Sequence, residues 1–183
     1  MRISILAFTA LTLGLGACTT VVEASAPAAA APVIEYPHVK RPNLVVSDIE
    51  RALTIYRDIL GLTASDIGTS SPDSYSYPVF KIPEGAQIRG ATLHEPGEQR
   101  VLALTELATI DLPRPSAAPH MSAVVIGVTD LAGKFEQIEA LGLTTTEPKI
   151  AGGVDFDFVE QAFVDYDGHL NVLYEVLPSQ GPN

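Results

Sequence analysis

The chain has 183 residues, of which 22 are acidic and 11 are basic, and its formal net charge at pH 7 is -11. A charge of this sign repels phosphate backbones and anionic lipid headgroups, so the composition argues against nucleic acid as a partner. One cysteine excludes an internal disulfide, and the length is enough for a single domain stabilised by its hydrophobic core.

Residues 1–17 have the pattern of a secretory signal peptide. Arg2 supplies the positive charge, an apolar run follows it, and small residues precede Cys18. The apolar run is too short to span a bilayer as a mature helix. The segment Leu15-Gly16-Ala17-Cys18 resembles the lipobox of bacterial lipoproteins, which implies cleavage before Cys18 and a lipid on its thiol. An ordinary signal peptide with an incidental cysteine is the alternative.

The lipoprotein resemblance also implies a location. We expect the chain in the bacterial cell envelope, held to a membrane by the lipid on Cys18, with its domain facing the periplasm. Thr19, rather than aspartate, follows the lipidated residue, which is similar to outer-membrane sorting signals and favours the outer membrane over the inner one.

Three further segments follow the signal. Residues 18–35 are rich in alanine and proline and lack a periodic apolar face, so we predict an extended, semi-rigid tether. The folded domain is predicted at residues 36–178, and residues 179–183 form a C-terminal tail.

A repeat divides the predicted domain into modules at about 36–112 and 118–178. Pro37-His38 and Val45-Val46-Ser47-Asp48-Ile49 recur as Pro119-His120 and Gly127-Val128-Thr129-Asp130-Leu131, with ten residues from histidine to aspartate in both copies. Each aspartate is predicted to cap an amphipathic helix that ends in Leu-Gly-Leu.

The two halves also share an order of elements. The predicted apolar helix faces consist of Ile49, Ala52, Leu53, Tyr56, Ile59 and Leu60 in the first copy, and of Leu131, Phe135, Ile138 and Leu141 in the second. Strands are predicted at 77–82, 87–93 and 100–107, and again at 144–150, 159–164 and 170–176. The order strand, helix, three strands therefore occurs twice, which predicts an α+β fold.

This doubled unit resembles the vicinal oxygen chelate superfamily, which includes glyoxalase I, extradiol dioxygenases and bleomycin-resistance proteins. The matching segments are 44–52, 56–62 and 163–170. The resemblance implies two βαβββ modules with curved mixed sheets around a shared cleft. It also implies a divalent metal held by four side chains, which acts on the substrate as a Lewis acid.

The metal-ligand positions that the resemblance implies do not carry metal ligands here. They fall on Arg41 and Ala123, seven residues before the two capping aspartates, and on Ala103 and Val172. Arginine stays protonated and has no lone pair to donate. A guanidinium about 4 Å from a divalent cation would repel it by about 8 kcal/mol at an effective dielectric of about 20. We therefore predict no cofactor, with a divalent metal at relocated ligands as the alternative.

Other side chains are candidates for a site. Arg41 is the first candidate for ligand binding, because its guanidinium can clamp a carboxylate or phosphate, although an internal salt bridge would also explain it. Tyr75 and Tyr77 lie in a predicted loop near the implied cleft and are candidates for stacking on a ligand. His38 and His120 occupy equivalent places in the repeat and form the alternative metal pair.

These observations leave three hypotheses for function. The first is a metal-independent domain that binds a small molecule. The second is an enzyme of the glyoxalase or dioxygenase type, a lyase, isomerase or oxygenase, that uses relocated ligands or needs no metal. The third is an interaction module of the cell envelope. Whether the chain is an enzyme stays open at this point, no catalytic residue is assigned, and a homodimer is compatible with the sequence.

Overall fold

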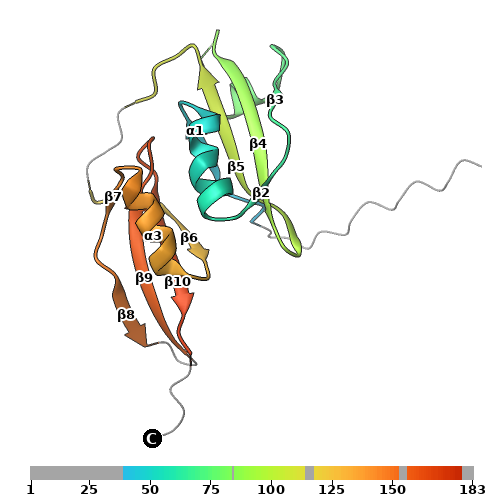
Figure 1. Cartoon of the computed structure of the whole chain (residues 1–183). Coiled ribbons are helices and arrows are strands. Elements are labelled where there is room, and N and C mark those ends of the chain that lie inside the picture. Colours follow the sequence, from blue (N-terminus) through green and yellow to red (C-terminus); the bar gives the residue numbers. More distant parts are fainter. Residues whose placement is uncertain (1–38, 84, 114–117, 153–155, 179–183) are drawn as a thin grey trace, which may run out of the picture. The chain divides into compact units, whose positions relative to one another are not determined.

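The computed structural model describes residues 39–83, 85–113, 118–152 and 156–178. In this part of the chain each predicted module forms one mixed sheet with a helix packed on it (Figure 1). The α+β fold of two similar modules is therefore confirmed. The predicted signal peptide, tether, C-terminal tail and His38 lie outside the described residues.

The first module runs from the first strand to the end of the fifth. Its elements are β1 (Asn43–Val46), α1 (Ile49–Leu53), η1 (Thr54–Ile59), β2 (Thr63–Ala64), β3 (Gly68–Thr69), α2 (Ser76–Val79), β4 (Gln87–Glu95) and β5 (Glu98–Ala108). The strand order is β1-β5-β4-β2, and β3 also pairs with β4. β1 runs parallel to β5, with Asn43 opposite Ala103, while β4 pairs antiparallel with β5.

The second module repeats this topology. Its elements are β6 (Ala123–Gly127), α3 (Leu131–Ala140), β7 (Thr144–Thr145), β8 (Lys149–Gly152), β9 (Asp157–Val164) and β10 (Leu170–Val176). The strand order is β6-β10-β9-β7, and β8 also pairs with β9. β6 runs parallel to β10, with Val125 opposite Val172. None of the described helices is both long and apolar enough to cross a membrane.

The helix starts and ends match the sequence prediction. The Asp48 carboxylate accepts a hydrogen bond from the Arg51 N–H at 2.9 Å, and Asp130 accepts one from the Gly133 N–H at 3.2 Å. Such caps satisfy N–H groups that have no partner within the helix. Gly61 and Gly142 follow the helices with φ of 84° and 75°, a conformation that glycine adopts without steric cost.

The first helix differs from the prediction in its second half, where η1 is a π-helix. The Leu60 N–H bonds to the Ile55 carbonyl at 2.9 Å, five residues back rather than four. The apolar face of the helix differs from the prediction in this region. Ile55, absent from the predicted face, is fully buried, whereas Ile59 is only partly buried.

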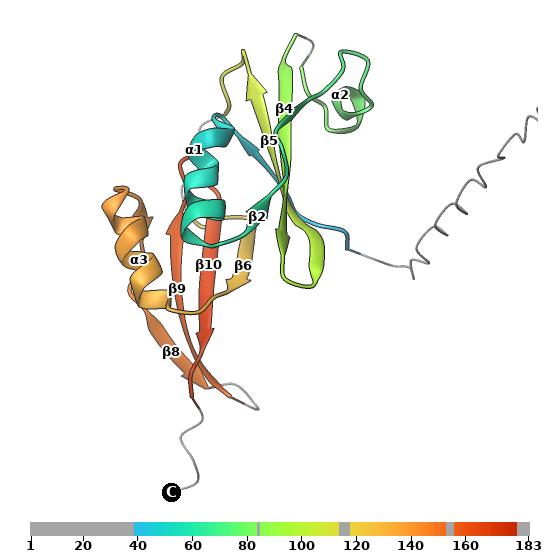
Figure 2. The same cartoon turned by 45° about the vertical axis from the view of Figure 1, so that its right-hand side comes forward.

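The strand predicted at residues 77–82 is wrong. Ser76–Val79 forms the short helix α2, beside β4 in Figure 2, and the strands that follow the first helix are β2 and β3. Pro78 explains the error, because proline cannot donate to a strand ladder but is tolerated in the first turn of a helix. In the second module Pro148 separates β7 from β8, which the sequence analysis had joined as one strand at 144–150.

One hydrophobic cluster extends through both modules. It includes Tyr56 of η1, Phe135 of α3 and Phe163 of β9, and the two phenylalanine rings meet edge to face with centroids 6.2 Å apart. Burial of this apolar surface is the main favourable contribution to folding.

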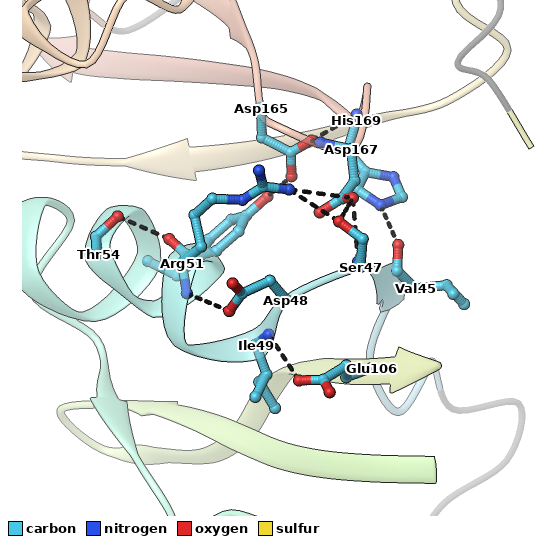
Figure 3. Close-up of polar contacts among 11 residues, drawn as sticks. Val45, Ser47, Asp48, Ile49, Arg51, Thr54, Glu106, Asp165, Asp167 and His169 are labelled. Atoms are coloured by element: carbon cyan, nitrogen blue, oxygen red, sulfur yellow. Dashed lines mark hydrogen bonds and ion pairs between the residues drawn. The ribbon is translucent and has the colours of Figure 1, made fainter. Parts of the chain in front are cut away.

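Polar contacts also join the modules, several of them drawn in Figure 3. The Ser47 N–H donates to Asp167 at 3.0 Å, and the His169 Nε2 lies 2.8 Å from the Val45 carbonyl oxygen. These contacts join the end of β1 to the turn between β9 and β10. Two segments that carry the family resemblance, 44–52 and 163–170, therefore also hold the two modules together.

Candidate functional site

An open cavity of about 500 Å³ lies within the first module. Residues of β4 and β5 line it together with the chain that leads into β1 and the segment around α2. Figure 2 shows where β4, β5 and α2 lie in the fold. Gly90 and Ala91 of β4 and Ala103 of β5 contribute almost no side-chain volume to this wall. The small residues leave the space open, and the volume is typical of small-molecule sites.

Arg41 lines this cavity just before β1 and is partly buried. Its Nε and Nη1 atoms are buried, and neither has a hydrogen-bond partner among the described residues. Leaving such a donor unsatisfied costs about 1–3 kcal/mol, or more for a charged group. The ion pairs within the described ranges involve Arg51, Arg57 and Arg89, so Arg41 is not explained by an internal salt bridge.

The charges of the cavity differ from those of the chain. Lys40 and Arg41 line it with a single carboxylate, Asp66, although the whole chain has a net charge of -11. The remaining polar lining consists of neutral groups such as Asn43 and Ser65. The cavity is thus a locally cationic site in an acidic protein, and fields of this kind favour an anionic ligand.

The two candidate tyrosines lie in different places. Tyr75 lines the Arg41 cavity together with Phe80, and both are exposed, at 73% and 55% of their surface. Tyr77 instead lines a separate cavity of about 640 Å³, and its hydroxyl donates to the Ala86 carbonyl at 2.9 Å. Only Tyr75 is therefore placed beside Arg41.

The four positions implied for metal ligands do not surround one cavity of the described chain. Arg41 and Ala103 share the first cavity, Ala123 lines one of about 290 Å³, and Val172 lines one of about 190 Å³. A cation and three hydrocarbons offer no lone pair to a metal ion. The residues at these positions do not fit the metal centre that the resemblance implies.

The histidine pair is only half described. His120 is partly exposed and belongs to no group of three metal-ligating side chains in the part of the chain that the structure describes. His38 lies outside that part, so the proposed pairing stays a prediction.

The structure brings together an acidic group that sequence reasoning missed. Carboxylate oxygens of Asp48, Glu50 and Glu106 lie within 4.8 Å of one another. The Arg89 guanidinium bonds to both glutamates, at 3.1 Å for Glu106, and its hydrogen bond holds the pKa of Glu50 below its ordinary value. Glu106 also accepts the Ile49 N–H at 2.9 Å (Figure 3). Arg89 therefore offsets part of this negative charge, and Asp48 and Glu106 bind N–H groups at the start of α1, outside the cavity.

Residues 36–173 match the family model of the Glyoxalase/Bleomycin resistance protein/Dioxygenase superfamily. The chain belongs to this superfamily. A superfamily protein with the same fold is a glyoxalase family protein from Bacillus cereus, with 14% identity and a TM-score of 0.64 over 81% of this chain and 100% of that one. A search of curated proteins gives no match.

A second solved structure is the fosfomycin resistance protein FosX from Listeria monocytogenes, complexed with Mn(II) and sulfate. It is 12% identical, with a TM-score of 0.50 over 77% of this chain and 93% of that one. At such identities the likeness to either structure shows the shared superfamily fold alone.

Proposed function

We propose that this chain is a membrane-anchored member of the superfamily whose first module binds a small molecule without a metal ion. The observation that carries the proposal is the pairing of Arg41 with Ala103 in one cavity, where the resemblance implies metal ligands. A positive charge occupies one of these positions and a methyl group the other. The space remains, while the means of holding a metal is replaced by a cationic side chain.

The same proposal includes the anchor. The lipobox-like segment before Cys18 supports lipidation of the chain, and two acyl chains suffice for stable anchoring. The Ala/Pro-rich residues 18–35 would then hold the domain away from the bilayer, so that a ligand reaches the cavity from the periplasm.

Elemental analysis and ligand screening test the binding proposal. Purified protein should contain no stoichiometric divalent metal, and small molecules that raise its melting temperature should do so equally with and without EDTA. Ala103→Phe should abolish these shifts by filling the cavity. Val172→Phe, at the equivalent position of the second module, should leave them intact. A stoichiometric metal whose removal by a chelator abolishes binding or turnover would overturn the proposal.

A metal-dependent enzyme is the second candidate, and two observations favour it. FosX is described with Mn(II), and Asp48, Glu50 and Glu106 place carboxylate oxygens close together. Glu50→Gln should lower metal content and turnover if this group holds the ion. If the chain binds its ligand without a metal, as proposed above, Glu50→Gln and the wild-type protein should bind the same ligands.

A further inference from the structure

We infer that the ligand of the Arg41 cavity is a small organic anion with one negative charge, joined to an apolar body about the size of an aromatic ring. This inference rests on the proposed function, because it names the chemical class that the same cavity takes.

The first argument is the state of the Arg41 guanidinium. Its Nε and Nη1 are buried without hydrogen-bond partners among the described residues, beside an open space. Buried donors in native proteins are almost always satisfied, so such an exception calls for an explanation. A carboxylate in the cavity supplies it, because a guanidinium that turns toward it donates two parallel charge-assisted hydrogen bonds.

The second argument is the balance of charges on the lining. Lys40 and Arg41 contribute two positive charges and Asp66 one negative charge. A ligand with one negative charge neutralises the remaining positive charge. A dianion would leave an uncompensated negative charge inside a chain whose net charge is already -11.

The third argument concerns the rest of the ligand. Tyr75 and Phe80 line the cavity with most of their surface exposed. The Ala103 methyl group adds apolar surface where β4 and β5 form the wall. An apolar body attached to the anionic group would cover the exposed rings, and aromatic side chains favour flat or edge-on contacts with such a body.

Calorimetric titration of the full purified chain with four probes tests this inference. Benzoate carries both features, benzamide has the same shape without the charge, acetate has the charge without the ring, and phenyl phosphate carries more negative charge. We expect benzoate to bind at least about ten times more tightly than benzamide or acetate, and phenyl phosphate no more tightly than benzoate.

Two variants test whether Arg41 is the residue that selects the negative charge of the ligand. Arg41→Gln should weaken benzoate binding about 10- to 100-fold and weaken benzamide binding by a much smaller factor. Arg57→Gln removes the same charge from an exposed site outside the cavity, so it should leave both affinities unchanged. Benzoate binding that persists in Arg41→Gln, or phenyl phosphate binding ten times more tightly than benzoate, would overturn the inference.

The outcomes also separate this inference from the proposed function. Equal affinity for benzoate and benzamide, with both lost in Ala103→Phe, would mean that the cavity binds small molecules but does not select a charge. If none of the probes bound and the wider screen of neutral and anionic compounds also gave no shift, both proposals would fail.

Discussion

Glu106 and Glu175 occupy equivalent positions in the two modules, and each carboxylate accepts a hydrogen bond from the first residue of its module's helix. Glu106 accepts the Ile49 N–H and Glu175 the Leu131 N–H, both at 2.9 Å. A carboxylate at a helix N-terminus satisfies an unpaired donor and interacts favourably with the helix dipole. The repeat therefore fixes each helix on its sheet through the last strand of the same module.

The two glutamates differ in their surroundings, and this difference gives the first prediction. Glu106 is buried and also pairs with Arg89, whereas Glu175 is partly exposed. Glu106→Gln should lower the free energy of unfolding by about 1–3 kcal/mol, because it leaves Arg89 without its buried partner. Glu175→Gln should cost less than about 1 kcal/mol. Urea denaturation of both variants measures the two losses of unfolding free energy. Equal losses would contradict this prediction.

The exposed pair of Glu50 and Arg89 predicts a pH dependence. The hydrogen bond from Arg89 holds the pKa of Glu50 below its ordinary value of 4.5. The pair therefore stabilises the folded chain above pH 4.5, and this contribution is lost as the pH falls through the lowered pKa.

The melting temperature of Glu50→Gln, compared with that of the wild-type protein from pH 7 to pH 2, checks this dependence. The difference between the two proteins should be present at neutral pH and disappear in acid, and added salt should reduce it. Glu98→Gln, an exposed change at the start of β5, provides the control. A difference that stays constant across this range would exclude the pair as its source.

Tyr56 links the modules through its hydroxyl group, which gives the third prediction. The hydroxyl donates to Asp165 at 2.8 Å, and burial raises the pKa of Tyr56 far above its ordinary value, so the group stays protonated. Tyr56→Phe should lower the free energy of unfolding by about 1–3 kcal/mol, because Asp165 loses a buried donor. Tyr75→Phe, on an exposed ring, should change it by less than about 0.5 kcal/mol. Similar effects of the two variants would remove the proposed role of this contact.

Replacing Arg41, unlike replacing Glu106 or Tyr56, should not destabilise the ligand-free protein. If its unsatisfied guanidinium is kept for a ligand, Arg41→Met should leave the ligand-free protein equally stable or stabilise it by about 1 kcal/mol. Benzoate should then no longer raise the melting temperature. Denaturation of the ligand-free variant is the measurement, and a loss of more than about 1 kcal/mol would assign Arg41 a structural role instead.

The sequence could predict those features that depend on local patterns. Asp48 and Asp130 were identified as caps from the repeat, and β10 has the predicted bounds at Leu170–Val176. The π-helical turn was not predictable, because a shift of one residue leaves the apolar pattern almost unchanged. The start of β2 does have a sequence signal, since Thr63 follows Leu-Gly-Leu as Thr144, the first residue of β7, does in the second module.

The site was harder to predict than the fold, because it depends on which side chains meet. The sequence identified Arg41 and Tyr75, and both line one cavity. Phe80 and Asp66 carried no local signal for a site. The equivalence of Glu106 and Glu175 also required the sheet register, since each contacts a helix 44 or more residues earlier in the chain.

The membrane anchor gives the last prediction, which concerns Cys18. In the lipoprotein interpretation this thiol carries the acyl chains, and an acidic chain gains no attraction to anionic headgroups. Cys18→Ser should therefore move the protein from the membrane fraction to the soluble fraction, and it should abolish labelling by a fatty acid. Thr19→Asp should keep the label but shift the protein from the outer to the inner membrane in a host where the sorting rule applies. A Cys18→Ser protein that stays with the membrane would show that something other than the lipid retains it.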